Sequence, residues 1–104
     1  MVKKSCIFML TDTDRKRHEH TAEKGRVLPF VVQYELLFEG RWVPIVRYDT
    51  SHGYAHKDLI NPDGTQEKIL MGMADFAKAL ELADMDINEN WERYKERYFR
   101  RMRR

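Results

Sequence analysis

Cysteine is almost missing from the sequence: Cys6 is the only one in 104 residues, so the chain cannot form an internal disulfide. We therefore expect a cytoplasmic location, because reducing compartments keep thiols unpaired. Cys6 lies in the apolar run of residues 5–10, and we expect its thiol to be buried, since a free cysteine behaves as a small hydrophobe. The run is far too short to cross a membrane, so no membrane partner is predicted.

Motifs that would identify a chemistry are also missing. The sequence has no glycine-rich phosphate loop, no Walker lysine, no nucleophile elbow and no CxxC pair. A helix-turn-helix pair is not indicated either, because only one long helix is predicted. The four histidines leave a site of two imidazoles and one carboxylate formally open, but we predict no metal and no cofactor. These histidines are His18, His20, His52 and His56.

What the sequence does contain is charge, at 35% of residues, with 42% apolar residues and a net charge of only +2. A chain of this length is predicted to form one domain over residues 1–104. The high charged share favours a water-exposed surface and is also typical of thermophile proteins, in which charged residues form ion-pair networks.

The pattern of the first seventy residues predicts an antiparallel meander of four to five strands. Residues 5–10 are predicted to form a central or doubly covered strand, and the almost wholly polar residues 11–26 a loop or mobile arm. Residues 27–38 are the clearest strand, because apolar residues recur at every second position and would face the core. These are Phe30, Val32, Tyr34, Leu36 and Phe38. Residues 54–60 and 67–71 are predicted to follow as strands on either side of the turn at residues 61–64.

The return strand of residues 42–48 raises a question of register. A two-residue loop at Glu39-Gly40 would pair Leu36 with Val43, whereas a three-residue loop would pair Leu36 with Pro44. We favour the second register, because it keeps Trp42, Pro44, Val46 and Tyr48 on the core face. Proline cannot donate to a strand ladder, so an edge or a bulge is expected at Pro44. The opposite face would then carry a partly polar set that could line a groove, formed by Gln33, Glu35, Arg47 and Asp49.

Residues 75–104 are predicted to form one long amphipathic helix packed on a face of the sheet, which makes the fold class α+β. Apolar residues step by three or four positions from Phe76 to Tyr98, no glycine or proline interrupts, and Asp75 is the expected N-cap. Such a helix exceeds the diameter of a domain this size. Its last turns, rich in aromatic residues, must therefore project, bend or pack on a second copy, and a homodimer is one hypothesis.

The stretch between residues 47 and 58 concentrates the residue types that catalysis needs. Arg47 is suited to hold a phosphate, and His52 and His56 titrate near neutral pH and would exchange protons. With Asp49 orienting a histidine or Arg47, these residues would suffice to cleave RNA without a metal. The alternative is structural. Arg47 and Asp49 would satisfy a turn, and His52 would cap the bend by hydrogen bonds to the backbone. Tyr48 and Tyr54 would belong to the core, each with its hydroxyl in water.

A basic cluster ends the sequence, with five arginines and no acidic residue in the last eight positions. It would contact the phosphate backbone of a nucleic acid, and the neighbouring aromatic rings would stack on bases. The alternative is a solubilising, frayed helix end. The arginines are Arg97, Arg100, Arg101, Arg103 and Arg104.

The run from Trp42 to Gly53, the turn at residues 61–64 and the late Asn90-Trp91-Glu92-Arg93-Tyr94 resemble a family of small uncharacterised proteins from archaea and thermophilic bacteria. The Arg47-Tyr48-Asp49 core with nearby histidines is also similar to TumE-type toxins of toxin–antitoxin pairs. Thr50 replaces the asparagine of the toxin pattern, and only His52 and His56 remain of its paired histidines. The toxin resemblance implies RNA as the target and a DNA-binding antitoxin as the partner.

Two hypotheses follow. The first is a small cytoplasmic protein of toxin–antitoxin type that binds RNA, with metal-independent cleavage as a further hypothesis. The second is a non-enzymatic interaction or structural module that dimerises through the C-terminal helix.

Overall fold

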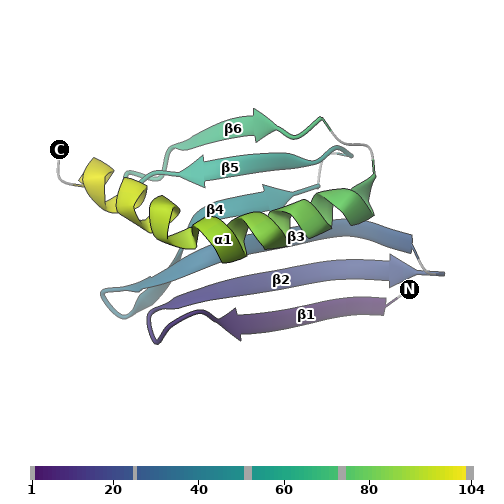
Figure 1. Ribbon diagram of the computed structural model, residues 1–104, viewed down its shortest axis with the longest axis horizontal. Coiled ribbons are helices and arrows are strands. Elements are labelled where there is room, and N and C mark those ends of the chain that lie inside the picture. The colour runs from purple at the N-terminus through teal and green to yellow at the C-terminus, as the bar shows by residue number, and fades with distance from the viewer. Residues whose placement is uncertain (1, 25, 51–52, 73–74, 103–104) are drawn as a thin grey trace.

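In the part of the chain that the structure describes, six strands form one antiparallel sheet in sequence order, and a single helix covers one face of it (Figure 1). This computed structural model describes residues 2–24, 26–50, 53–72 and 75–102. The α+β class, the antiparallel meander and the C-terminal helix are confirmed, but the sheet has six strands rather than four to five. The elements are β1 (Val2–Met9), β2 (Asp14–Glu23), β3 (Arg26–Phe38), β4 (Arg41–Asp49), β5 (His56–Ile60), β6 (Gln66–Leu70) and α1 (Phe76–Met102).

The prediction of a loop or arm at residues 11–26 is wrong, because most of this stretch is β2, which pairs with β1 and β3. Its polar side chains have partners on both sides of the sheet. Asp14, fully buried, accepts a hydrogen bond from the Tyr34 hydroxyl at 2.5 Å. On the opposite face, Arg15 Nε lies 2.6 Å from Glu35 Oε1. The sequence looked like a loop because this strand is stabilised by hydrogen bonds and ion pairs instead of an aliphatic face.

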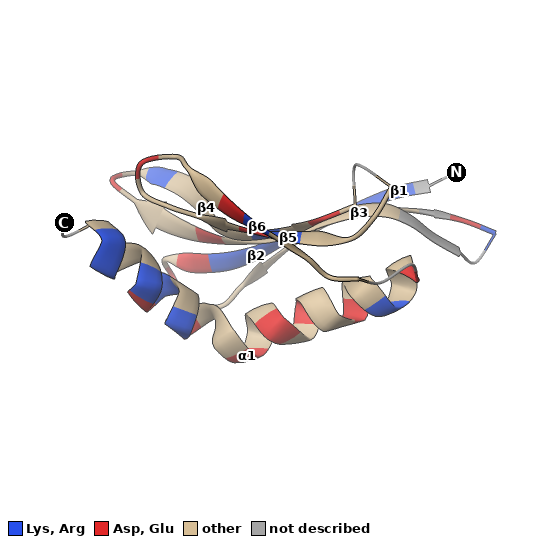
Figure 2. Cartoon of the chain, turned by 90° about the horizontal axis from the view of Figure 1, so that it is seen from above, with Lys and Arg blue, Asp and Glu red and all other residues tan. Residues whose placement is uncertain are grey.

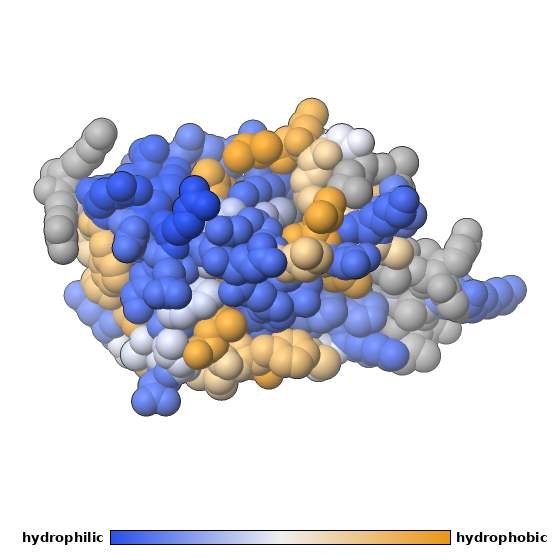
Figure 3. All heavy atoms as spheres, viewed as in Figure 1, coloured by the Kyte–Doolittle hydropathy of each residue, from blue (hydrophilic) through white to orange (hydrophobic). Residues whose placement is uncertain are grey.

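β1 is not the central or doubly covered strand that its apolar run predicted. Among the described residues, β2 is the only strand beside it, so β1 lies at an edge of the sheet (Figure 1). The helix does not cover this edge, because α1 packs over β3 and β4. Consequently Ile7, Phe8 and Met9 are exposed, at 53%, 47% and 56%. Apolar side chains are visible at the edge of the molecule where β1 lies (Figure 3). The prediction of a buried thiol is also wrong, since Cys6 is exposed.

The β3–β4 hairpin combines both registers that the sequence left open. At the turn Leu36 pairs with Val43, as a two-residue loop requires, and Glu39 and Gly40 both have positive φ. An extra residue, Ile45, then shifts the register, and from Tyr34 opposite Val46 onward the predicted pairing holds.

The bulge beside Pro44 is therefore confirmed, whereas the pairing of Leu36 with Pro44 is wrong. Trp42 is also displaced from the predicted core face. The Arg15 guanidinium lies 4.1 Å from its ring centre, and Arg15 binds Glu35 on the face that α1 does not cover.

The core lies between α1 and the even-numbered residues of β3, as the alternation predicted. Phe30, Val32, Tyr34 and Leu36 are all buried, and small helix residues such as Ala79 and Ala83 allow α1 to approach the sheet closely. The predicted N-cap is confirmed, because Asp75 Oδ1 accepts hydrogen bonds from two backbone N–H groups at the start of the helix.

The aromatic residues late in α1 are covered by the chain's own sheet. The ring centres of Trp91 and Tyr34 are 5.9 Å apart, and those of Phe99 and Phe38 are 6.3 Å apart. The helix curves with its convex side toward solvent (Figure 2), and the molecule is 46 Å long, so the length of α1 needs no second copy. The premise for a dimer through this helix is therefore removed.

Candidate functional site

The face of the sheet that α1 leaves open carries three of the four predicted catalytic residues. Arg47 and Asp49 lie on β4, and the β4–β5 register places Asp49 opposite His56 and Arg47 opposite Asp58. The predicted grouping of Gln33, Glu35, Arg47 and Asp49 on one face is confirmed by the strand registers. His52, the fourth predicted catalytic residue, lies outside the described residues.

A chain of polar contacts crosses this open face from β2 to β4. Glu35 is bound by Arg15 and by the Gln33 amide, and Gln33 Oε1 accepts a hydrogen bond from Arg47 Nε at 2.9 Å. Because Glu35 and Gln33 are buried, this series of hydrogen bonds fixes the orientation of the Arg47 side chain. Arg47 itself reaches the surface and lines a shallow depression of about 290 Å³ with Arg17, Glu19 and Asp49, among others.

His56 sits less accessibly than a proton-transfer role would need. It is only 2% exposed, its Nε2 lies 3.6 Å from Asp58 Oδ2, and the Tyr54 ring packs beside it with 5.7 Å between ring centres. Asp58 is buried as well. A substrate on this face would therefore meet Arg47 and Asp49 before His56, which favours a supporting role for the imidazole.

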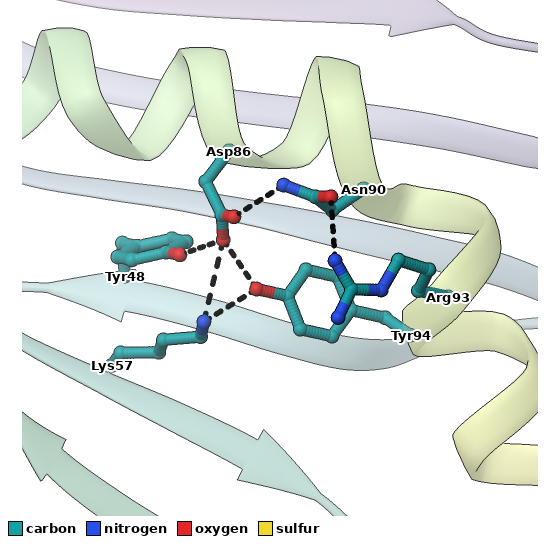
Figure 4. Close-up of polar contacts among 6 residues, drawn as sticks. All are labelled: Tyr48, Lys57, Asp86, Asn90, Arg93 and Tyr94. Atoms are coloured by element: carbon teal, nitrogen blue, oxygen red, sulfur yellow. Dashed lines mark hydrogen bonds and ion pairs between the residues drawn. The ribbon is translucent and has the colours of Figure 1, made fainter.

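On the other face, Asp86 of α1 is the centre of a polar cluster that ties the helix to the sheet (Figure 4). Its carboxylate accepts hydrogen bonds from the hydroxyls of Tyr48 and Tyr94 and from the Asn90 amide, and it pairs with Lys57 at 3.3 Å. The Lys57 ammonium also donates to the Tyr94 hydroxyl. The cluster therefore joins β4, β5 and two turns of α1 through a single carboxylate.

The electrostatics of this cluster favour anchoring over acid–base chemistry. Burial would raise the pKa of Asp86, but the hydrogen bonds from Tyr48 and Tyr94 and the Lys57 charge outweigh it and lower that pKa. Burial, and then the hydrogen bond to Asp86, raise the pKa of Tyr48 and of Tyr94. The carboxylate thus stays ionised and both phenols stay protonated near neutral pH.

This cluster was not predicted from the sequence. A signal for its helical part is visible in the sequence, because Asp86, Asn90 and Tyr94 recur at intervals of four and so lie on one side of a helix. Nothing in the sequence indicates which strand residues meet them, since Lys57 and Tyr48 are brought there by the sheet register.

Charge is unevenly distributed along α1, with mostly acidic side chains early in the helix and mostly basic ones late (Figure 2). Residues 76–92 carry five acidic side chains and one lysine, whereas residues 93–102 carry five basic side chains and one glutamate, Glu96. The basic half, defined as residues 93–102, borders a groove of about 440 Å³. Arg93 and Arg100 are exposed there, and the Arg93 guanidinium donates to Asn90 Oδ1 at 3.3 Å. The groove is lined by Asp86, Asn90, Arg93, Tyr94, Glu96, Arg97 and Arg100.

The predicted nucleic-acid-binding arginines differ in their ion pairs within the protein. Arg97 and Arg101 both pair with Glu67 of β6, the latter at 3.4 Å, whereas Arg100 has no hydrogen bond or ion pair within the described residues. Arg103 and Arg104 lie outside the described residues. Arg93 was not among the predicted arginines, because it lies outside the basic cluster of the last eight positions.

The two predicted sites lie on opposite faces of the sheet. Arg47 and Asp49 belong to the open face, whereas the basic half of α1 lies on the covered face. A nucleic acid that follows the helix would therefore reach Arg47 only by passing around an edge of the sheet.

The remaining histidines do not assemble a metal site in the described part of the chain. The rings of His18 and His20 stack on β2 with 4.7 Å between their centres. Over residues 2–24, 26–50, 53–72 and 75–102, no three His, Cys, Asp or Glu side chains are grouped as metal ligands. Within the same residues, no helix has both the length and the apolar character that crossing a membrane requires.

Fold and sites together define an α+β meander protein with a mixed-charge open face and a helix whose second half is basic. The chain belongs to the family described as Domain of unknown function (DUF7718), whose model matches residues 1–104. No curated protein and no solved structure matches the chain.

Proposed function

We propose that this protein binds RNA through the basic half of α1. The observation that carries the proposal is the segregation of charge along one helix in a chain whose net charge is only +2. Such a local concentration of arginine attracts a phosphate backbone without requiring a basic protein overall.

The geometry of the groove supports this proposal. Arg93 and Arg100 lie two helical turns apart, about 10 Å, which is compatible with contacts to successive phosphates of one strand. Asn90, which already orients Arg93, adds an amide at the same surface. The Asp86 cluster holds this part of α1 against the sheet, so the arginines are presented by a rigid element.

Binding is tested with a fluorescently labelled single-stranded RNA of mixed sequence, by anisotropy between about 50 and 200 mM salt. The Arg93→Gln/Arg100→Gln variant should bind about tenfold more weakly, and the slope of log affinity against log salt should fall by about 1.4. The matched control is Arg41→Gln/Lys68→Gln, which removes the same charge from exposed positions away from the groove. Equal binding by the two variants, or no RNA binding by the wild type, would overturn the proposal.

Metal-independent cleavage of RNA is the second candidate function. The observation that favours it is the common face of Arg47, Asp49 and His56, with Asp49 directly opposite His56. Arg47 would hold a phosphate and His52 would carry a proton. Asp49 and the buried His56 would support these groups from the same face.

Cleavage is measured with the same RNA in the presence of a chelator. Arg47→Gln should lower the rate by about a hundredfold or more if its guanidinium stabilises the transition state, while Arg41→Gln should leave it unchanged. His52→Ala and His56→Gln test the two imidazoles, with circular dichroism checking that the buried position at His56 still folds. RNA that stays intact with the wild type would refute cleavage and leave the binding proposal standing.

The toxin–antitoxin setting remains part of the proposal. The similarity of Arg47-Tyr48-Asp49 to TumE-type toxins supports it, and the expected partner is an antitoxin that binds DNA. Expression of the chain alone should then slow cell growth, and the Arg47→Gln variant should not. Equal growth of the two strains would argue against a toxin.

A further inference from the structure

The two edges of the sheet are built differently. β6 has five residues, includes Glu67 and Lys68, and is tied to α1 through the pairing of Glu67 with Arg97. β1 has eight residues, and its second half, from Ser5 to Met9, contains no charge. Although Ile69 and Leu70 are exposed on β6, charges interrupt that edge, which is a common protection against strand pairing. The second half of β1 lacks this protection, because its only charges, Lys3 and Lys4, lie in the first half.

The backbone of β1 is ready to accept another strand. The Leu10 N–H donates to the Asp14 carbonyl at 2.8 Å, and the register with β2 continues without a shift. Even-numbered residues of β1 therefore bond to β2, and odd-numbered ones direct their N–H and C=O groups away from the sheet. Among the described residues, no element lies beyond β1 (Figure 1). The outward-facing residues are Lys3, Ser5, Ile7 and Met9.

We propose that β1 pairs with β1 of a second copy, antiparallel, to form a homodimer with a continuous twelve-stranded sheet. A two-fold axis relating two antiparallel edge strands must be normal to the sheet, so one residue lies opposite its own copy. Both α1 helices then lie on the same face of the joined sheet.

The charges on β1 select the register. Placing Cys6 opposite its copy pairs seven residues of each strand and sets every lysine against an uncharged residue. Centring on Ser5 would bring the lysines of the two copies closer together, and centring on Ile7 would pair only five residues. The selected pairs are Cys6 with Cys6, Ser5 with Ile7, Lys4 with Phe8 and Lys3 with Met9.

The interface that results is self-complementary in both its backbone and its side chains. Four pairs of odd-numbered residues would exchange about eight backbone hydrogen bonds. Ile7 and Met9 would lose solvent exposure on the open face, and Phe8 on the face of α1. Lys4 of each copy would lie across from the Phe8 ring of the other, where a cation is attracted to the aromatic face. A second copy therefore matches this edge in charge, register and apolar content.

Sedimentation velocity without RNA tests the dimer independently of the proposed function. The wild type should sediment as a dimer at micromolar concentration, and Ile7→Pro should give a monomer with an unchanged circular dichroism spectrum. The Ile7 N–H points outward, so its loss removes no bond to β2. Ile7→Lys is the second variant and should also give a monomer. Leu70→Lys, on the opposite edge of the sheet, is the matched control and should remain dimeric. A monomeric wild type, or a dimer broken only by Leu70→Lys, would overturn the proposal.

Oxidative cross-linking tests the register. Opposed residues in a non-hydrogen-bonded pair have Cα atoms about 4.5 Å apart, within the range that a disulfide spans. Copper phenanthroline should therefore convert the wild type to a covalent dimer through Cys6, the only cysteine. Phe8→Cys in a Cys6→Ser background should cross-link at least about tenfold more slowly. In the proposed register, residue 8 of one copy lies opposite residue 4 of the other, four residues away from the second residue 8. Equal rates for both proteins would refute this pairing.

Discussion

Replacing Asp86 by alanine should loosen α1 from the sheet, because this one carboxylate accepts four polar contacts from β4, β5 and the helix itself. Its side chain is 25% exposed. A hydrogen bond to a charged group contributes about 1.5–3 kcal/mol, and the contact from the buried Tyr48 hydroxyl belongs to this class. The contacts from Tyr94, Asn90 and Lys57, nearer to solvent, add about 0.5 kcal/mol each. The expected loss in the free energy of unfolding is therefore at least about 3 kcal/mol.

Urea denaturation followed by circular dichroism measures this loss, and Trp91 fluorescence reports separately on the contact between helix and sheet. The melting temperature should fall by about 12 °C or more. Glu89→Ala, an exposed acidic position on the same helix, is the control and should change stability by no more than about 0.5 kcal/mol. A loss for Asp86→Ala no larger than this control would refute the reasoning.

The pH dependence of the same variant supplies a second check. The pKa of Asp86 is lower in the folded protein than its usual value of 3.8, so its stabilisation is complete above that value. It is lost as the pH falls through the folded pKa, when the carboxylate takes up a proton. The difference in stability between wild type and Asp86→Ala should therefore be constant near neutral pH and shrink below about pH 4. A difference that grows on acidification would contradict this sign.

Three further predictions concern the sheet. Tyr34→Phe removes a buried donor to Asp14 and should lower the free energy of unfolding by about 1–2 kcal/mol in urea titrations, whereas no loss would mean that Asp14 is satisfied by its threonine neighbours. Burial raises the pKa of Tyr34 and Tyr48, so both phenols should ionise only when the protein unfolds at high pH. An alkaline titration that follows near-ultraviolet absorbance and circular dichroism together tests this, and ionisation before the loss of the circular dichroism signal would contradict their burial. At the β3–β4 turn, both Glu39 and Gly40 have positive φ, so Gly40→Ala should lower the free energy of unfolding by about 1 kcal/mol and Glu39→Asn should raise the melting temperature. A stabilising Gly40→Ala together with a destabilising Glu39→Asn would exclude the assigned turn.

The sequence predicted most reliably where a periodic apolar pattern coincided with a single buried face. The alternation from Phe30 to Leu36 identified the core strand, and the steps of three and four from Phe76 onward identified the helix and its cap. β2 was not predicted, because its polar side chains are stabilised by partners on other elements. Lys16, for example, is bound by Asp84 and Asn88, some seventy residues away.

Other features depended on relations that no local pattern encodes. Ile45 bulges because a two-residue turn and a shared apolar face demand registers that differ by one residue. Cys6 is exposed because α1 packs over β3 and β4, a choice that the apolar run around the cysteine does not reveal. For the candidate site, the common face of Arg47 and Asp49 followed from strand parity. The burial of His56 and the cluster around Asp86 required the assembled sheet.

The sequential strand order has a consequence for how the chain reaches this structure. Each strand pairs with the next one along the chain, so every hairpin can form from local contacts, and the low sequence separation favours rapid folding of the sheet. The contacts of α1 are different: Asp86 and Tyr48 are 38 residues apart, and Lys95 and Asp14 are 81 apart. Synthesis from the N-terminus therefore completes the sheet before the helix is available, and its apolar face stays open to water, to chaperones and to other nascent chains until α1 is made.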